Sequence, residues 1–263
     1  MKSEETLASR IQETTRLLKL PLVYKVFESC AEIARRNDST YESYLLEILE
    51  LEAQQRMQKR VERMLRESRL PVDKTIHTFD TKRLPPKVNA QVHALILGDF
   101  LKRRENILVF GNPGSGKTHL ISAIAHELIQ RGHKILFTAC SILVQQLLAA
   151  KRELMLPKFL QRLAKFEAII IDDIGYVQQS RDEMEVLFTL LAERYERGSV
   201  LLTSNLPFSK WEIIFKDPMT TAAAIDRLVH HSVILELNLK SYRLEASMNK
   251  KEVENSPQNQ QEK

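Results

Sequence analysis

One motif in the sequence has residue types and spacing that suit a single kind of chemistry, the binding of phosphate groups. Residues 111–118 fit the pattern G-x-x-x-x-G-K-[ST] without a mismatch, reading Gly111, Asn112, Pro113, Gly114, Ser115, Gly116, Lys117 and Thr118. Glycines let the backbone turn tightly and approach a ligand, so that successive N–H groups point at anionic oxygens. We expect Lys117 to reach the β- and γ-phosphates and the Thr118 hydroxyl to ligate Mg²⁺.

The residues on either side give this loop the two elements that a phosphate cradle requires. Residues 107–110 form an apolar run typical of a strand buried on both faces. Residues 119–130 then carry apolar side chains at helical spacing, so the N-terminus of a helix would follow the loop and favour an anion. The alternative, a glycine-rich structural turn, does not account for the complete motif in this setting.

Two adjacent carboxylates, Asp172 and Asp173, follow a second apolar run at residues 169–171. Open α/β sheets bind their ligands at the carboxyl ends of the strands. We expect Asp172 to hold Mg²⁺ through water beside Thr118, and Asp173 to orient or deprotonate the attacking water. An apolar strand that simply ends in a polar turn is the alternative.

Two further polar residues stand at positions where they could act on a phosphate. Asn205 ends the next predicted strand, which would place its amide beside the two acids and the γ-phosphate. Arg227 lies on a predicted helix before the last strand, and its guanidinium could serve the γ-phosphate of a neighbouring subunit. A turn role for Asn205 and a surface ion pair of Arg227 with Asp226 remain open.

The elements that would hold these residues alternate along the chain. Strand-like runs recur at residues 134–139, 168–172, 200–204 and 233–237, with helical patterns between them. This alternation predicts an α/β fold with a parallel five-stranded sheet between helices. A further helix is expected over residues 88–103, ahead of the first strand.

The chain divides into four predicted segments. Residues 1–70 are rich in Leu, Glu, Arg and Gln, and we expect a small all-helical N-terminal domain that serves oligomerisation or the binding of DNA or a partner. Its third helix should run over residues 41–65. Prolines make residues 71–85 a predicted linker, the main domain follows at 86–245, and the polar residues 246–263 are expected to be a disordered tail.

Composition places few further limits on function. The 263 residues hold 39 Lys and Arg against 34 Asp and Glu, and the net charge of +5 permits nucleic-acid binding without requiring it. Cys30 and Cys140 lie far apart in apolar surroundings, which argues against a disulfide framework or a Cys-based zinc site. The sequence has no long uncharged apolar run and no signal-peptide core, so we expect a cytoplasmic protein without a membrane partner.

These motifs, taken in order, resemble the AAA+ ATPases of the IstB/DnaC group, and more narrowly the IstB-type helpers of transposition. The resemblance covers roughly residues 5–245 and depends on residues 111–118, 171–176, 203–205, 226–228 and 241–243. It implies that Lys117 and Thr118 are Walker A contacts and that Asp172 and Asp173 are the Walker B acids. It also implies that Asn205 is sensor 1, Arg227 the arginine finger and Arg243 a second nucleotide-sensing arginine.

The resemblance further implies an AAA+ ATPase that uses ATP and Mg²⁺, forms a homo-oligomer on duplex DNA and recruits an IstA-type transposase to target DNA that it selects or remodels.

Two features depart from the wider AAA+ pattern. Asp173 stands where most members have Glu, so its shorter reach should make hydrolysis slow and dependent on DNA or a partner. Almost nothing follows Arg243 that could fold as a helical lid, so no C-terminal lid domain is expected.

Two basic segments are candidates for the DNA surface. One lies on the third predicted helix and the other in the helical insert before Asp172, and together they comprise Arg56, Lys59, Arg63, Arg66, Lys151, Arg152 and Lys158. The basic face of the third helix could run along a phosphate backbone. The insert has no obvious base-reading element, so we expect it to contact the phosphate backbone with strong salt dependence and little sequence preference. Solvated charged faces without a DNA role are the alternative.

Three functions are compatible with these features. The first is an ATP-driven helper of transposition that remodels DNA. The second is a DnaC-like replicative helicase loader, which would share the ATPase core but bind a helicase ring through its N-terminal domain. The third is an adaptor in which the bound nucleotide only sets assembly and hydrolysis matters little.

Overall fold

The computed structural model describes residues 6–175, 180–215 and 217–242 of the chain. The chain forms two compact units, Met1–Arg63 and Met64–Lys263, and each is considered by itself. The predictions made for Arg243 and for residues 246–263 lie outside the described residues. Among the described residues, no helix is long and apolar enough to cross a membrane.

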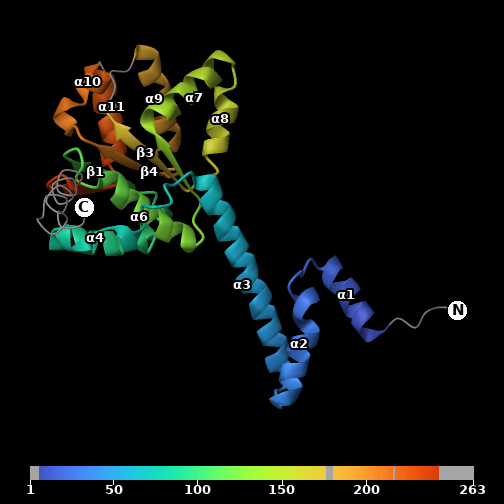
Figure 1. Cartoon of the computed structure of the whole chain (residues 1–263). Coiled ribbons are helices and arrows are strands. Elements are labelled where there is room, and N and C mark those ends of the chain that lie inside the picture. Colours follow the sequence, from blue (N-terminus) through green and yellow to red (C-terminus); the bar gives the residue numbers. More distant parts are fainter. Residues whose placement is uncertain (1–5, 176–179, 216, 243–263) are drawn as a thin grey trace, which may run out of the picture. The chain divides into compact units, whose positions relative to one another are not determined.

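The N-terminal unit is helical, as the sequence predicted. Its helices are α1 (Leu7–Leu17), α2 (Val23–Arg36) and α3 (Tyr41–Ser68), the last of which continues past the end of the unit (Figure 1). Val23, Phe27 and Cys30 of α2 pack against Ile48 of α3 in a small apolar core. The burial of Cys30 in this core agrees with a cysteine that serves packing rather than metal binding.

A buried carboxylate joins α3 to the beginning of α2. Glu52 is 3% exposed and accepts hydrogen bonds from the backbone N–H groups of Leu22 (2.8 Å) and Val23 (3.2 Å). Arg56 donates to the same side chain at 2.8 Å and also to the Lys19 carbonyl. Burial alone would raise the pKa of Glu52, but these hydrogen bonds outweigh it and lower the pKa below its ordinary value. Glu52 therefore caps α2 as a charged group.

The C-terminal unit is built on a five-stranded parallel sheet, which confirms the predicted fold. Its strands are β1 (Asn106–Gly111), β2 (Ile135–Ala139), β3 (Ala168–Ile174), β4 (Ser199–Ser204) and β5 (Ser232–Leu237). They lie in the order β2-β3-β4-β1-β5, and every neighbouring pair is parallel. Ile107, Leu108 and Val109 of β1, an interior strand, are fully buried, as expected for a strand covered on both faces.

Helices cover both faces of this sheet (Figure 1). Helix α6 (Lys117–Gln130) packs on one face with α4 (Pro86–Ile96) outside it. The other face is covered by α7 (Cys140–Arg152), α9 (Arg181–Arg194) and α11 (Pro218–Val229), with α8 (Leu156–Leu163) against α7 and α10 (Glu212–Phe215) against α11. Arg227 lies in the last turn of α11, and Lys151 and Arg152 end α7.

The single helix predicted over residues 88–103 is wrong in one respect, because the chain breaks it at Gly98. Helix α4 ends at Ile96 and a short α5 (Asp99–Lys102) follows. Gly98 between them has φ of +85°, a left-handed conformation that ends a helix and favours glycine. A Cβ on Gly98 would lie 2.9 Å from Nε2 of His133, so a larger residue there would have to displace that side chain.

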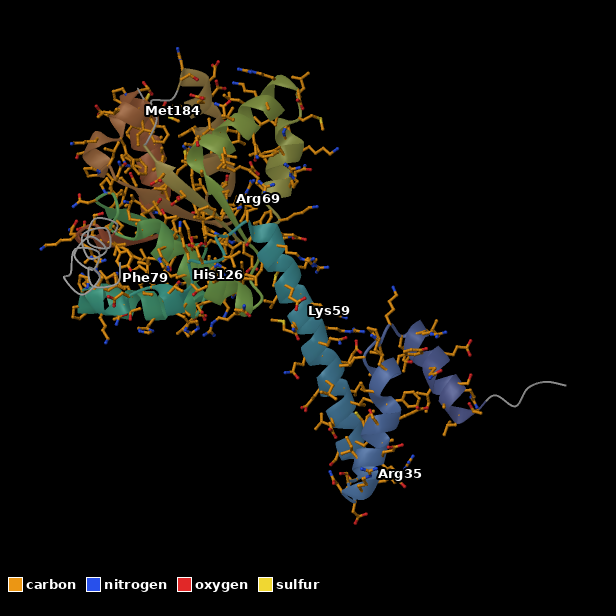
Figure 2. All side chains as sticks on the ribbon, viewed as in Figure 1. Arg35, Lys59, Arg69, Phe79, His126 and Met184 are labelled. Carbon is orange, nitrogen blue, oxygen red and sulfur yellow. The ribbon has the colours of Figure 1, made fainter. Side chains whose placement is uncertain are left out.

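Residues 71–85, predicted as a linker, form an ordered connector in the C-terminal unit. The connector contains two 3-10 helices, η1 (Ile76–Thr78) and η2 (Thr81–Arg83), and η1 contacts α6. Figure 2 marks Phe79 in the connector and His126 on α6. The His126 ring lies 2.9 Å from the Pro71 carbonyl oxygen, so the start of the connector and η1 both lie against the helix that follows the phosphate loop.

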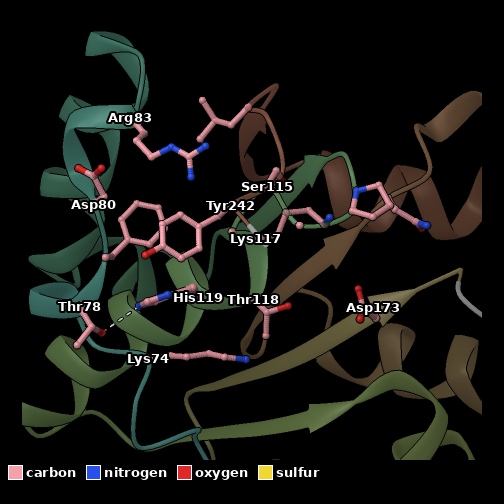
Figure 3. A pocket seen from close by; sticks show the side chains of 16 residues that line it. Lys74, Thr78, Asp80, Arg83, Ser115, Lys117, Thr118, His119, Asp173 and Tyr242 are labelled. Carbon is pink, nitrogen blue, oxygen red and sulfur yellow. Dashed lines mark hydrogen bonds between the residues drawn. The ribbon is translucent and has the colours of Figure 1, made fainter. Parts of the chain in front are cut away.

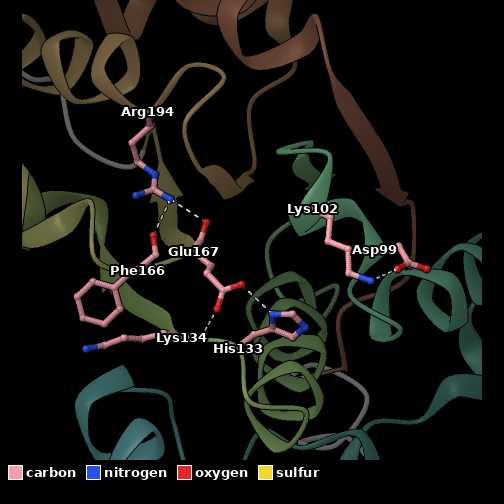
Figure 4. Close-up of polar contacts among 7 residues, drawn as sticks. All are labelled: Asp99, Lys102, His133, Lys134, Phe166, Glu167 and Arg194. Atoms are coloured by element: carbon pink, nitrogen blue, oxygen red, sulfur yellow. Dashed lines mark hydrogen bonds and ion pairs between the residues drawn. The ribbon is translucent and has the colours of Figure 1, made fainter.

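A buried arginine holds the amino ends of β3 and β4 together. Arg194, at the end of α9, is 4% exposed and donates to the carbonyl oxygens of Leu163, Phe166, Glu167 and Ser199 at 3.0–3.3 Å. Figure 4 shows the bonds to Phe166 and Glu167. Burial lowers the pKa of Arg194 to about 10, so the side chain is still charged at neutral pH. Gly198 leaves room for it, because a Cβ there would collide with the guanidinium.

We predict that Arg194→Met lowers the free energy of unfolding of the C-terminal unit by about 3 kcal/mol or more, because several buried carbonyl groups lose their donor. Urea denaturation followed by the fluorescence of Trp211, the single and fully buried tryptophan, measures this change. The matched control is Arg197→Met, which removes an exposed ion pair to Glu193 and should change stability by less than about 0.5 kcal/mol. Equal effects of the two substitutions would contradict the role of Arg194.

Candidate nucleotide-binding site

A pocket of about 260 Å³ lies at the carboxyl end of β1, where the phosphate loop begins (Figure 3). It unites four parts of the sequence: the connector, the phosphate loop, the ends of β3 and β4, and the segment after β5. The residues that line it include Lys74, Phe79, Arg83, Gly114, Gly116, Lys117, Thr118, His119, Asp173, Asn205 and Tyr242. The position agrees with the rule that open α/β sheets bind ligands beyond the carboxyl ends of their strands.

The phosphate loop has the backbone geometry that its sequence predicts. Gly114 and Gly116 have φ of +79° and +96°, in the left-handed region that glycine adopts without strain. Helix α6 begins directly after Gly116, so its free N–H groups face the pocket. The Lys117 ammonium donates to the carbonyl oxygens of Gly111 (2.9 Å) and Asn112 (3.0 Å), which holds it over the loop. These groups together form a cationic cradle for phosphate.

The first acid of the pair lies against the phosphate loop. The Thr118 hydroxyl donates to Oδ1 of Asp172 at 3.0 Å, and Asp172 is 8% exposed. Burial raises the pKa of Asp172, opposed by the Thr203 hydroxyl, and the negative charge of Asp173 raises it further. A hydroxyl beside a carboxylate is an all-oxygen donor set of the kind that Mg²⁺ prefers, so Thr118 and Asp172 fit the predicted metal site.

The second acid and the predicted amide also reach the pocket. Asp173 is exposed and lines it together with Asn205. Asp173 has φ of +58°, a left-handed conformation that Asp adopts more readily than most residues but that still costs about 1 kcal/mol or more. The structure thus brings Lys117, Thr118 and the two acids together with Asn205, as the strand ends predicted.

Arg227 does not join this pocket. It lines a second, small cavity with Asn106, the first residue of β1, and Val200, the second residue of β4. The amide of Asn106 donates to the carbonyl oxygen of Leu228 at 3.0 Å, which fixes the end of α11 at the amino edge of the sheet. Since β1 spans roughly 17 Å, Arg227 cannot serve the phosphate loop of its own subunit.

The Arg227 guanidinium lies over the ring of Phe188, with its central carbon 4.4 Å from the ring centroid. Its Nη1 is buried and, within the part of the chain that the structure describes, has no hydrogen-bond partner. The competing interpretation for Arg227 was a surface pairing with Asp226. The cation–π contact on Phe188 is the interaction found instead.

The DNA-binding candidates differ in their surroundings. Lys59, labelled in Figure 2, and Arg63 are exposed on α3, and Arg56 is also exposed but is engaged with the buried Glu52. Arg66, Arg152 and Lys158 are also exposed, and Lys151 forms an ion pair of 2.8 Å with Glu185. The structure contains no nucleic acid, so DNA contacts by these residues stay a prediction.

The sequence analysis assigned no role in the pocket to several residues that lie in the supposed linker, in α6 and after β5. The Phe79 ring covers the loop, since a Cβ on Gly116 would lie 3.2 Å from it. The ring nitrogen of His119 lies 3.1 Å from the Thr78 hydroxyl (Figure 3). The Tyr242 N–H donates to the Gly114 carbonyl at 3.0 Å, and Arg83 lies over the Tyr242 ring. No local motif marks such contacts, although all of these residues lie within the segment covered by the resemblance and Tyr242 belongs to residues 241–243, on which it depends in part.

The sequence of this chain is similar to those of known ATP-binding proteins. The sequence model of the family described as IstB-like ATP binding protein matches residues 13–250, which is most of the chain. This chain belongs to the IstB-like ATP binding protein family. A Sinorhizobium fredii member named as an insertion sequence ATP-binding protein is 43% identical over 235 residues, 89% of this chain and 79% of that protein. The IS5376 ATP-binding protein of Geobacillus stearothermophilus is 37% identical over 89% of this chain and 94% of its own length.

Solved structures agree with this membership at the level of the fold. The DnaC helicase loader superposes with a TM-score of 0.53 at 18% identity, covering 64% of this chain and 98% of that one. AMPPCP-bound DnaA from Aquifex aeolicus gives a TM-score of 0.53 at 16% identity, covering 72% of this chain and 57% of DnaA. These likenesses confirm the fold predicted from the sequence, a parallel sheet between helices, and at such low identity they extend to the fold alone.

Proposed function

We propose that this chain binds ATP with Mg²⁺ in the pocket at the carboxyl ends of the strands and hydrolyses it to ADP and phosphate. The observation that carries the proposal is the hydrogen bond from Thr118 to Asp172, which joins the phosphate loop to the acid pair. Membership of the IstB-like ATP binding protein family supports ATP as the ligand. A loop with this lysine and this acid pair serves phosphoryl transfer in P-loop enzymes.

Each residue has a defined task in this proposal. Lys117 and the N–H groups at the start of α6 bind the phosphates, and Thr118 and Asp172 would hold the Mg²⁺. When bound, that ion neutralises charge on the phosphate oxygens. Asp173 accepts the proton of the attacking water or orients it, and Asn205 fixes the water or the γ-phosphate. Asp173 is one methylene shorter than glutamate, so turnover should be slow.

We also propose that the site is completed by a second subunit. Arg227 lies at the opposite edge of the sheet from its own phosphate loop, so only the loop of another copy is within its reach. A guanidinium that meets the γ-phosphate stabilises the charge of the transition state. Hydrolysis would therefore depend on assembly.

The biological setting that we propose is transposition, with assembly on duplex DNA and recruitment of a transposase. Support comes from relatives up to 43% identical, whose names tie them to insertion sequences. The DnaC helicase loader shares only the fold at 18% identity, which makes helicase loading the second candidate. The exposed basic residues of α3 and α8 suit backbone contacts, and a net charge of +5 favours association with DNA.

The first prediction from this proposal concerns hydrolysis. The wild-type protein should release phosphate slowly from ATP, and random-sequence duplex should stimulate it several-fold, because assembly on DNA supplies Arg227 from a neighbour. Lys117→Ala should abolish the activity, whereas the control Lys87→Ala, at an exposed site outside the pocket, should not change it. A rate insensitive to duplex would contradict the DNA-coupled proposal, and equal rates for Lys117→Ala and wild type would contradict the site.

A second prediction tests whether Arg227 acts on another subunit. Arg227→Ala and Lys117→Ala should each be inactive alone, because one lacks the finger and the other the phosphate contact. Mixed in equal amounts with duplex and ATP, they should recover a measurable fraction of wild-type activity, since some interfaces then pair an intact loop with an intact arginine. Full activity of Arg227→Ala alone would contradict the proposal, as would no recovery on mixing while both variants still co-assemble.

A further inference from the structure

Strand β3 has an irregular register at Asp172 and Asp173. In the ladder between β3 and β4, Ile171 pairs with Leu202 and Ile174 pairs with Ser204. Two residues of β3, Asp172 and Asp173, therefore stand opposite a single residue of β4, Thr203. Such a β-bulge interrupts the ladder and changes the direction in which side chains point.

The Thr203 hydroxyl fills the gap that the bulge leaves. It accepts the backbone N–H of Asp173 at 2.8 Å and donates its own hydrogen to Oδ1 of Asp172 at 2.7 Å. Thr203 is fully buried, so no solvent competes for either bond. One side chain thus contacts both acids, one through its backbone and the other through its carboxylate.

These two bonds determine where each acid points. Asp173 is held in a left-handed conformation, φ +58°, and its N–H is satisfied by a side chain of the neighbouring strand. With that conformation fixed, its carboxylate lines the pocket. Oδ1 of Asp172 accepts hydrogen bonds from the hydroxyls of both Thr203 and Thr118, the latter at 3.0 Å. Thr203 and the phosphate loop therefore orient this carboxylate from two sides.

We propose that Thr203 is the positioning residue of the acid pair: its hydroxyl locks the bulge and so orients Asp172 toward the metal position and Asp173 toward the attacking water. This inference rests on the proposed ATPase function and adds to it a residue that does not touch the nucleotide. Thr203 lies two positions before Asn205, the strand-end residue expected to act directly. Asn205 would then contact the phosphate, whereas Thr203 would orient the two acids.

Valine and serine at this position separate the hydroxyl from the shape of the side chain. Thr203→Val keeps the branched, buried side chain and removes both hydrogen bonds, whereas Thr203→Ser keeps the hydroxyl and removes a methyl group. Thr138→Val is a matched control, because Thr138 is also a buried strand threonine, 6% exposed, and its hydroxyl donates to the Ala139 carbonyl at 3.2 Å rather than to an acid.

The experiment measures, for wild type and the three variants, ATP hydrolysis, ATP affinity with and without Mg²⁺, and hydrogen exchange at the Asp173 amide. For Thr203→Val we expect kcat to fall about 10- to 100-fold, as for other partners of metal-binding residues, with KM within about threefold of wild type. The gain in ATP affinity on adding Mg²⁺ should shrink, and the Asp173 amide should exchange faster. Thr203→Ser should stay within about threefold of wild type in each measurement, and Thr138→Val should match wild type.

Unchanged kcat, Mg²⁺ dependence and amide exchange in Thr203→Val would overturn the inference. Equal losses in Thr203→Ser and Thr203→Val would overturn it as well, because the hydroxyl would then not be the active feature. A wild-type protein that binds ATP with Mg²⁺ without hydrolysing it would refute the proposed hydrolysis alone, and the Mg²⁺ dependence and amide exchange would still decide the role of Thr203. A wild-type protein that binds no ATP would overturn both proposals.

Discussion

Parallel pairing of β1, β4 and β3 brings the carboxyl ends of three strands to one edge of the sheet, and the candidate site depends on this alignment. The phosphate loop follows β1, the acids end β3, and Asn205 follows β4. The Thr118–Asp172 hydrogen bond, between residues 54 positions apart, is a direct result. Because each strand is buried between helices, its end has little freedom, which gives the polar groups fixed positions.

The same sheet carries different groups at its two ends. Its carboxyl edge holds the phosphate loop and the acids, while its amino edge holds the end of α11 with Arg227. A single copy therefore has a phosphate-binding site and, at the far edge, a guanidinium for which it offers no phosphate. In this account, assembly brings the two edges of different copies together, so nucleotide binding and oligomerisation become linked equilibria.

Much of this arrangement could be predicted from the sequence. Apolar runs identified all five strands, because strands buried on both faces are largely apolar, although the edge strand β5 carries the exposed Glu236. The phosphate motif placed the start of α6 close to its observed position, with the helix expected from residue 119 and found from Lys117. The break at Gly98 was missed because isolated glycines also occur within helices, and sequence pattern alone does not reveal its left-handed φ of +85°. The contacts of Phe79 and Tyr242 join segments distant in sequence, which no local pattern encodes. The role of Thr203 depends on a bulge, a register feature invisible to strand periodicity.

The central claim is that ATP bound at the phosphate loop drives assembly of this protein on duplex DNA. Sedimentation of the purified chain with a random-sequence duplex, in ATP, in ADP and without nucleotide, tests it most directly. We expect large protein–DNA assemblies with ATP but not with ADP or without nucleotide, and no assemblies of Lys117→Ala under any of these conditions. Assembly on duplex that is the same in all three nucleotide conditions, or no association with duplex in any of them, would contradict it.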